Sequence, residues 1–453
     1  MTSGLLRGHR DFRLLWVGET ISGVGGRVSA VAFPLVALVV LDANPTQMGL
    51  LTATQYAPVL LAPMVAGVVV ERYRCRPVML VAHMGRAAAL ALAYLLWIAG
   101  ELTMTWLYLV AFVIGALTAA FDVATQTYLP RLIGRDRLVA GNAAMQASYS
   151  SSQAVGPGIG GALASAIGSP ATLILDLVSY VVAATGLILI RHREGRERLA
   201  GSAIHRVPAA FGFVLRHPVT GLLLRHSIVY NLFEQAVAVA FVVFAVRTLT
   251  LSPTSLGAVM GIGSLGALAG AILGRRAGQR WGLRAVLIAG KGGASVGLAA
   301  LVLCHGNGVV AVATAGAAFA IYGFGLTLVN VHSVSLRQAI TPDHIQSGAF
   351  AAYRTMTFVA VPVGAALGGF AAQHWGPRTA IAVCAGALVV AWLWFSVVST
   401  HHLASRLAAL KLASDHACEG KHSHDRHCRN PRLRGVSQAP VALRIATLEH
   451  ARP

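Results

Sequence analysis

The sequence MTWLYLVAFVIGALTAAFDVATQTY occupies residues 104–128 and carries one charged side chain, that of Asp122. A helix of about 20 apolar residues crosses the hydrocarbon core of a bilayer, so this run is long enough to span a membrane. Its apolar residues are continuous, whereas the strands of a membrane β-barrel alternate over segments of about ten residues. Eleven further runs of this kind occur at about residues 12–41, 47–70, 78–98, 139–167, 171–190, 221–246, 254–274, 284–304, 308–331, 345–373 and 378–398. The sequence therefore predicts twelve transmembrane helices and no barrel.

The composition excludes most other classes of protein. Of the 453 residues, 56% are hydrophobic and 11% are charged, against roughly 25% charged in a soluble domain. Neither a disordered chain nor a small disulfide-stapled scaffold has this composition. The first apolar run contains Glu19 and Arg27 and is too long for a signal peptide, so we expect it to be retained. We therefore expect a polytopic membrane protein.

Basic residues are distributed very unevenly over the predicted loops. With a cytoplasmic N-terminus, 31 of the 36 Lys and Arg residues lie on the cytoplasmic side, and Lys291 is counted among them. Only Arg247 and Arg378 lie outside. Because cytoplasmic loops are enriched in Lys and Arg, this bias predicts that both termini are cytoplasmic. The net charge of +20 then reflects membrane topology, and we expect no nucleic-acid partner.

The two halves of the chain resemble each other at a nearly constant offset. Asp136 matches Asp343 and Gly161 matches Gly368 at an offset of 207, and further pairs match at 208. This indicates duplication of a six-helix unit, as in transporters that bind substrate between two repeats. We predict an all-α membrane protein with two pseudosymmetric six-helix halves. The expected boundaries are residues 1–190 and 219–400 for the halves, 191–218 for a cytoplasmic linker and 401–453 for a disordered cytoplasmic tail.

Two short motifs combine small residues with fixed charges. The first joins the second and third runs, with a copy in the other half that lacks the acid; its residues are Gly67, Glu71, Arg72 and Arg76, then Arg280 and Arg284. The glycine allows close helix approach, and the acid can pair with an arginine or a helix N-terminus to latch one conformation. The second motif lies in the run 139–167 and comprises Gly156, Pro157, Gly160 and Gly161. Its proline kinks the helix and its glycines present a small packing face.

These motifs resemble those of the major facilitator superfamily. The loop motif resembles the cytoplasmic loop motif of that family, and the second resembles the antiporter motif of its drug exporters. Together with residues 11–16, 121–130 and 135–143, they are similar to the twelve-span drug:proton antiporter branch, which includes macrolide and siderophore exporters. The resemblance covers residues 7–398 and implies the major facilitator fold. His83 stands where that branch usually has an acid.

Polar side chains inside the predicted spans are candidates for the substrate and proton pathway. A charge at the centre of a membrane helix costs about 2.5–3.5 kcal/mol, so its presence suggests a use. Our candidates are Glu19, Arg27, Gln55, Asp122, Gln126, Asn231, Glu234, Asn330 and Arg354. Glu19 and Arg27 are eight residues apart and could face one cavity. The alternative is a set of structural ion pairs inside the bundle.

A cluster of histidines and cysteines marks the C-terminal tail. It comprises His416, Cys418, His422, His424, His427 and Cys428. These residue types could hold Zn²⁺ or Cu⁺, but their spacing matches no ordered zinc finger. We expect no bound metal, and a disordered basic tail near anionic lipid.

The sequence and the resemblance together imply proton-driven export of a small amphipathic organic molecule by alternating access. We expect no enzymatic activity and no cofactor besides the proton gradient, because no Walker A sequence is present to bind ATP. The expected partners are the substrate and the lipid bilayer, and the expected state is a monomer in a bacterial cytoplasmic membrane. Two alternatives remain open: an uncoupled or importing permease of the same family, and a membrane sensor or scaffold that transports nothing.

Overall fold

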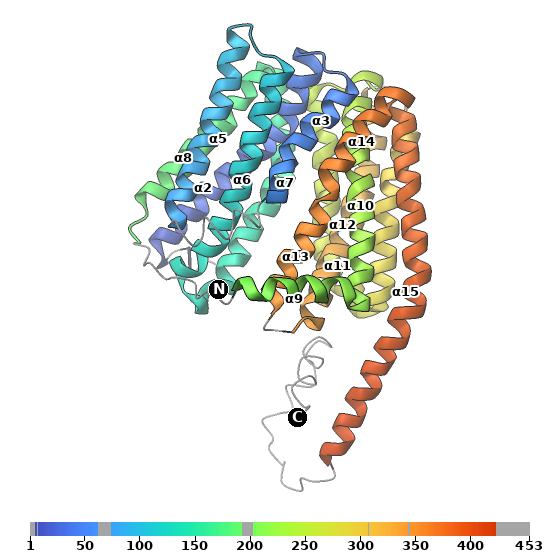
Figure 1. The fold of residues 1–453 in the computed structure, drawn as a ribbon. Helices are drawn as coiled ribbons and strands as arrows, with labels where there is room; N and C mark the ends of the chain where they lie inside the picture. The colour runs from blue at the N-terminus through green and yellow to red at the C-terminus, as the bar shows by residue number, and fades with distance from the viewer. Residues whose placement is uncertain are drawn as a thin grey trace.

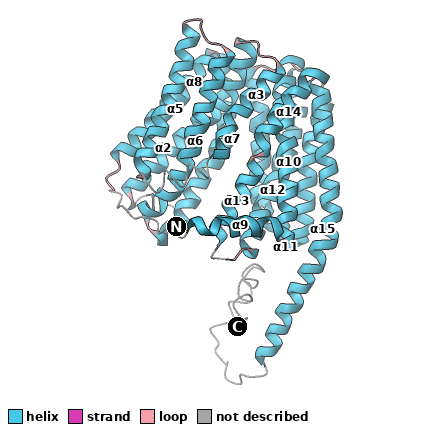
Figure 2. Cartoon of the chain, viewed as in Figure 1, coloured by secondary structure: helices cyan, strands magenta, loops and turns pink. Residues whose placement is uncertain are grey.

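The regular elements of this protein are helices throughout the part of the chain that the structure describes. A computed structural model describes residues 5–6, 8–61, 74–192, 203–306, 308–342 and 345–422. Within these ranges no strand occurs, and the long helices run side by side along one direction (Figures 1 and 2). The predicted all-α class is therefore confirmed.

The helices form two groups of six segments on either side of a linker helix. The first group comprises α2 (Arg10–Leu35), α3 (Pro45–Tyr56), α5 (Cys75–Ile98), α6 (Met104–Ile133), α7 (Leu138–Ile167) and α8 (Ser169–Leu189). The linker carries α9 (Ala203–Arg216). The second group comprises α10 (Pro218–Val243), α11 (Pro253–Ala300), α12 (Gly308–Ile340), α13 (Gln346–Phe358), α14 (Ala360–Trp375) and α15 (Pro377–His422). Short helical turns are η1 (Val36–Val40), η2 (Ala57–Leu61), η3 (Arg135–Arg137), η4 (Phe244–Thr248) and η5 (Leu301–Leu303).

Ten helices in the described residues are long and apolar enough to cross a membrane. Two of these spans, Pro253–Gly274 and Arg276–Leu303, lie on α11, which is kinked at Gly282 (φ of +79°), and α13 with α14 makes one. The two remaining predicted spans fall on α3 and α7. The run 47–70 leaves the described residues after 61, and α7 contains the polar sequence SYSSSQ at residues 148–153, which lowers its mean hydropathy. The twelve predicted apolar runs thus correspond to helical segments of the structure.

Backbone irregularities repeat between the halves at an offset of 208 residues. A π-helical turn follows the first helix of each half, at Val36–Val40 and again at Phe244–Thr248. Asp42 and Thr250 both have φ of +47°, which is uncommon outside glycine. Gly168 and Gly376 turn the chain before the last span of each half, with φ of +85° and +82°. Because such features are costly and specific, their repetition supports an internal duplication.

Two pairs of glycines join the halves at symmetry-related positions. A Cβ atom added to Gly369 of α14 would lie 2.7 Å from the Cα atom of Gly49 in α3. A Cβ atom added to Gly161 of α7 would lie 3.0 Å from the Cα atom of Gly257 in α11. Gly257 and Gly369 lie 208 residues after Gly49 and Gly161, respectively. The halves therefore pack backbone against backbone at two points, which only residues without a side chain allow.

Both the predicted linker and the first part of the tail that the sequence predicts to be disordered contain helix. In the predicted linker 191–218, α9 lies crosswise to the long helices in Figure 1 and packs against α10 and α13. In the predicted tail, α15 continues without interruption to His422. Residues 423–453 lie outside the described part, so the predicted disorder of that segment stays a prediction.

Candidate functional site

A cavity of about 530 Å³ lies among helices of the second half and reaches α3 of the first. This volume is within the usual range for small-molecule sites. The lining residues are Tyr56, Ser227, Tyr230, Asn231, Glu234, Gln235, Leu326, Asn330, Arg337, Phe350, Tyr353, Arg354, Thr357, Phe358 and Val361. Aromatic rings and a few polar groups share these walls, so the cavity suits an amphipathic organic molecule.

Glu234 is the acidic residue among those that line this cavity. The hydroxyl of Tyr322 in α12 donates a hydrogen bond to its Oε1 atom at 2.6 Å. One turn earlier on α10, the Asn231 amide donates to the carbonyl oxygen of Thr357 at 3.0 Å. That carbonyl lies in the last turn of α13, just before the interruption at Val359. Phe358 and Val361, on either side of the break at Val359, line the cavity together with Glu234.

Arg354 of α13 connects the cavity to the first half. Its guanidinium lies 3.3 Å from a carboxylate oxygen of Asp122 in α6. Four predicted pathway residues therefore line the cavity (Asn231, Glu234, Asn330 and Arg354), and a fifth, Asp122, pairs with one of them.

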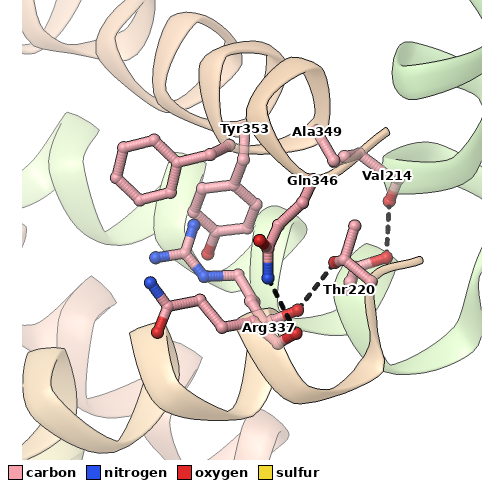
Figure 3. Close-up of a pocket in the computed structure, with 9 residues that line it drawn as sticks. Val214, Thr220, Arg337, Gln346, Ala349 and Tyr353 are labelled. Atoms are coloured by element: carbon pink, nitrogen blue, oxygen red, sulfur yellow. Dashed lines mark hydrogen bonds between the residues drawn. The ribbon is translucent and has the colours of Figure 1, made fainter. Parts of the chain in front are cut away.

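A small pocket of about 20 Å³ lies beside the cavity, between α9, α12 and α13 (Figure 3). Its volume is enough for one water molecule. Arg337 is shared by both spaces, and its guanidinium lies 3.7 Å from the centre of the Tyr353 ring. In Figure 3 the Thr220 hydroxyl donates to the Val214 carbonyl at 3.1 Å, which fixes α9 to the start of α10. The cavity is thus bounded on this side by the linker helix.

Glu19 lies in the first half, in contact with α5 rather than with the cavity. Its Oε1 atom is 3.2 Å from Nε2 of His83, and Nδ1 of His83 is 3.1 Å from a guanidinium nitrogen of Arg86. The Arg86 guanidinium lies between two rings, 4.7 Å from that of Phe121 and 4.5 Å from that of Tyr180. The histidine where the sequence resemblance expects an acid is thus the centre of a buried polar chain.

Arg27, Gln55 and Gln126 do not line the cavity. Arg27 donates to the hydroxyl of Tyr149 in α7 at 3.1 Å, so it and Glu19 bind different helices. The carbonyl oxygen of Gln55 packs against Gly115, and the neighbouring Tyr56 is the residue of α3 that lines the cavity. Gln126 is exposed on α6. The predicted convergence of Glu19 and Arg27 on one cavity is therefore not seen among the contacts of either side chain.

A second buried pair lies in the other half and was missed from the sequence. The Nζ atom of Lys291 is 2.7 Å from Nδ1 of His226. Lys291 is 4% exposed and His226 is 1% exposed. Counting Lys291 among the cytoplasmic loop charges was wrong, because it lies on the ninth span, inside the helix bundle. The repeat offset was a signal that could have found this pair, since His226 and Lys291 follow Glu19 and His83 by 207 and 208 residues.

Comparison with known proteins identifies the family. The sequence profile of the Major Facilitator Superfamily matches residues 15–330 and again residues 227–414. The chain belongs to the Major Facilitator Superfamily. It is 25% identical over 413 residues to a protein of Bacillus subtilis (strain 168) named Uncharacterized MFS-type transporter YfiS. The match covers 86% of this chain and 93% of the relative.

Solved structures of the superfamily share the fold. A POT family transporter in complex with 5-aminolevulinic acid has a TM-score of 0.71 at 11% identity, covering 86% of this chain and 96% of that one. The nucleoside transporter NupG has a TM-score of 0.69 at 13% identity, covering 85% and 98%. A bacterial homologue of the iron transporter ferroportin, in an inward-facing state, has a TM-score of 0.67 at 16% identity with the same coverages. These identities establish the fold alone, and the chain is a multi-pass membrane protein with the major facilitator fold.

The superfamily loop motif lies largely outside the described residues. Gly67, Glu71 and Arg72 fall in the range 62–73, which the structure does not describe. Arg76 donates to the carbonyl oxygen of Ile188 at 2.8 Å, near the C-terminal end of α8. A cation is favourable there because the carbonyl groups of a helix end carry partial negative charge. In the second copy, Arg280 is exposed and Arg284 is half-buried, on either side of the turn at Gly282.

The predicted antiporter motif lies on α7 and faces two other helices. A Cβ atom added to Gly156 would meet the side chain of Arg27, and one added to Gly160 would lie 2.9 Å from the Val28 carbonyl oxygen. Gly161 instead contacts Gly257 of the other half. Pro157 is inside the helix, one turn before Gly161. This segment thus packs α7 against α2 and against α11 at once.

The His/Cys cluster of the tail cannot be placed. The backbone of His416, Cys418 and His422 belongs to α15, with side chains outside the description, and His424, His427 and Cys428 lie wholly outside it. In the described ranges, no three His, Cys, Asp or Glu side chains are grouped as a metal site would require.

Proposed function

We propose that this protein exports a small amphipathic organic molecule from the cytoplasm in exchange for protons, by alternating access about the cavity described above. The observation that carries the proposal is Glu234, a carboxyl group that faces an aromatic-lined cavity and is hydrogen-bonded by Tyr322. A carboxyl group at this place can exchange a proton and also contact a bound molecule. Competition between the two would couple them.

The lining favours a substrate with an apolar body and polar ends. Tyr56, Tyr230, Phe350, Tyr353 and Phe358 supply ring surfaces on which a flat or apolar molecule can pack. Asn231, Gln235 and Asn330 offer both donors and acceptors. The structural relatives include nucleoside, iron and peptide-family transporters, so the fold by itself does not choose the substrate, and our proposal rests on the chemistry of these walls.

The proposed orientation places both termini in the cytoplasm of a bacterial cell, with the protein in the cytoplasmic membrane. In this orientation the glycine pairs Gly49–Gly369 and Gly161–Gly257 lie toward the outer surface and hold the halves together there. The cavity would then be reached from the cytoplasm, as an exporter requires before it loads. We propose that the transporter acts as a monomer without cofactor, with the proton gradient supplying about 2.3 kcal/mol per charge per 100 mV.

An uncoupled or importing permease is the second candidate. It is favoured by the contacts of Glu19, whose carboxylate is bound to His83 in the first half and so is not presented to the cavity. If Glu234 likewise served only to fix Tyr322, transport would need no proton.

Proton flux in everted membrane vesicles tests the proposal. The lumen is acidified, a panel of amphipathic drugs and siderophores is added, and a pH dye follows the gradient. We expect the substrate to collapse the gradient in the wild type and in Glu101→Gln, a control acid exposed in the loop after α5. Collapse should be lost in Glu234→Gln. If gradient collapse were lost in Glu19→Gln instead, proton coupling would be assigned to the first half. Substrate movement without collapse of the gradient would establish the uncoupled permease.

A further inference from the structure

The Lys291–His226 pair is a buried ionisable site that lines no part of the cavity. Lys291 lies on the second segment of α11 and His226 on α10, with their side-chain nitrogens 2.7 Å apart. Burying a charge in a membrane bundle is costly unless another group compensates it. Within the described residues, no Asp or Glu carboxylate lies within 4.0 Å of either nitrogen. The pair is therefore two bases in contact, which can share one proton.

Two aromatic rings pack against this pair. From α15, the Phe395 ring lies 4.5 Å from the Lys291 nitrogen and meets the His226 ring edge-on. From α10 itself, the Tyr230 ring stacks on the His226 ring at 18°, with centroids 6.0 Å apart. Ring faces attract a cation weakly, so a proton can stay on Lys291 without an acid beside it.

His226, Tyr230 and Glu234 follow each other at intervals of four residues on α10. Residues at this spacing lie above one another on the same face of a helix. The chain of ionisable groups therefore runs from Lys291 through His226 and Tyr230 to Glu234 at the cavity. Because α10 begins at Pro218 and Lys291 is nine residues beyond the turn at Gly282, the Lys291 end is the one nearer the proposed cytoplasmic side.

Two polar atoms along this line lack a protein partner in the described part of the chain. They are Nε2 of His226 and the hydroxyl oxygen of Tyr230, and both are buried. Leaving such groups unpaired inside a protein destabilises it. The hydrogen bond of His226 to Lys291 uses Nδ1, so the free nitrogen is the one left for the next group in the line. A proton path needs a succession of such unpaired groups, because each group must be able to accept a proton before it donates one.

We propose that Tyr230, His226 and Lys291 carry protons from Glu234 toward the cytoplasm by a route that leaves the substrate cavity at Tyr230 and continues outside it; this inference rests on the proposed proton coupling. Glu234 gives its proton to the Tyr230 oxygen through a bridging water, while the Tyr230 hydroxyl proton passes through a second bridging water to Nε2 of His226, because neither acceptor has a protein partner within hydrogen-bond distance in the described residues. The Nδ1 proton of His226 then passes to the neutral amine of Lys291. Glu234 ends as a carboxylate and Lys291 as an ammonium, with His226 neutral in its other tautomer.

The hydrogen bond between Lys291 and His226 survives this transfer with its direction reversed. Before the transfer Nδ1 donates to the amine, and afterwards the ammonium donates to Nδ1. The related pair in the first half cannot work in the same way, because Glu19 supplies an acid to His83 and Arg86 occupies the other ring nitrogen. Of the two related pairs, the Lys291–His226 pair of the second half is therefore the one that can accept a proton from a neighbouring group. A substrate in the cavity would leave the part of this route at His226 and Lys291 open, because neither residue lines the cavity.

The test measures how fast Glu234 changes protonation in the purified protein in lipid. A pH jump is followed by infrared absorption of the protonated carboxyl group, with the Glu234 band assigned by its loss in Glu234→Gln. We expect Tyr230→Phe, which removes only a hydroxyl group, to slow the change about tenfold or more while its final extent stays the same. His226→Leu combined with Lys291→Met should slow it similarly and leaves no base unpaired. Ser295→Ala is the matched control, because Ser295 is buried one turn after Lys291 and bonds to the Leu388 carbonyl.

Two other outcomes are informative in different ways. Wild-type rates in Tyr230→Phe and in the double variant would overturn the route and show that Glu234 exchanges protons with cavity water. No protonation change of Glu234 in the wild type would overturn the route and the proposed coupling together. The vesicle assay separates these cases, since it reports proton coupling whatever path the proton takes.

Discussion

Arg354 of α13 and Asp122 of α6 form an ion pair at 3.3 Å that joins the two halves beside the cavity. Both side chains are close to half exposed, at 43% and 45%. An ion pair in such surroundings is worth roughly 0.2–1 kcal/mol. The pair can therefore bias the equilibrium between conformations without locking it, as the proposed alternating-access cycle requires.

Asp122→Asn should lower the population of the conformation described here by about fivefold at most, the equivalent of about 1 kcal/mol. Spin labels on cysteines at positions 137 and 279, which are exposed in the two halves, would report the change as a redistribution of distances. Asp136→Asn is the control, because Asp136 is exposed on η3. If Asp122→Asn and Asp136→Asn gave the same distances, the ion pair would have no part in the equilibrium.

Gly161→Ala should separate the halves where α7 meets α11. The added methyl group would meet the Pro253 carbonyl oxygen and lie 3.0 Å from the Cα atom of Gly257. Backbone atoms cannot move aside as a flexible side chain can, so we expect transport to fall about tenfold or more, with overpacking costing about 1–3 kcal/mol. Gly158→Ala is the matched control on the same helix, since nothing lies within 4 Å of its added Cβ atom.

The same steric argument applies at the symmetry-related contact between Gly49 and Gly369. Gly49→Ala should act like Gly161→Ala, because its methyl group would lie 2.6 Å from the Ala365 carbonyl oxygen. Efflux from intact cells measures transport, and surface expression measures separately how much of each variant reaches the membrane. Normal transport by both variants would mean that the halves do not need this close contact.

Arg86→Lys should destabilise the first half although the charge is kept. The Arg86 guanidinium donates to the Ala82 carbonyl and contacts His83, with its plane between two aromatic rings. A lysine ammonium is not planar and cannot make these contacts together, so we expect a loss of roughly 2–4 kcal/mol in unfolding free energy. Thermal unfolding in detergent would show a lower Tm. Arg225→Lys, at an exposed arginine of α10, should leave the Tm unchanged, and equal Tm values for both variants would contradict the prediction.

The fold could be predicted because each membrane span appears in the sequence as a long apolar run. Gly282 shows why the count succeeded, since it turns the chain between two such runs although the helix bonding continues around it. The span of α7 was harder to recognise, because its serines and glutamine lower its hydropathy while its glycines pack against other helices. The apolar run 139–167 still predicted the helix, and the motif inside it indicated the packing face.

The site could be predicted only in part because it depends on how the helices are rotated. Glu234 was identified from its charge, but its partner Tyr322 is one of ten tyrosines and lies 88 residues away. Glu19 has the same kind of charge and faces α5 instead of the cavity. His226 and Lys291 could have been found by applying the repeat offset to Glu19 and His83, whose positions they share in the other half. Single charges suggest a site, and contacts between distant helices decide which of them belong to it.

The predicted orientation can be tested by labelling single cysteines in intact cells. In a variant that keeps Cys304 and lacks the other native cysteines, Glu101→Cys should react with a membrane-impermeant maleimide and Asp136→Cys should not, because the loops 99–103 and 134–137 lie on opposite sides of the proposed membrane. Both positions are exposed. The native Cys304, in the turn after η5, gives little background because burial raises the pKa of its thiol, and the thiolate is the reactive form. Its labelling should therefore increase as the pH rises. Labelling at position 136 but not at 101 would reverse the proposed topology, and with it the export direction.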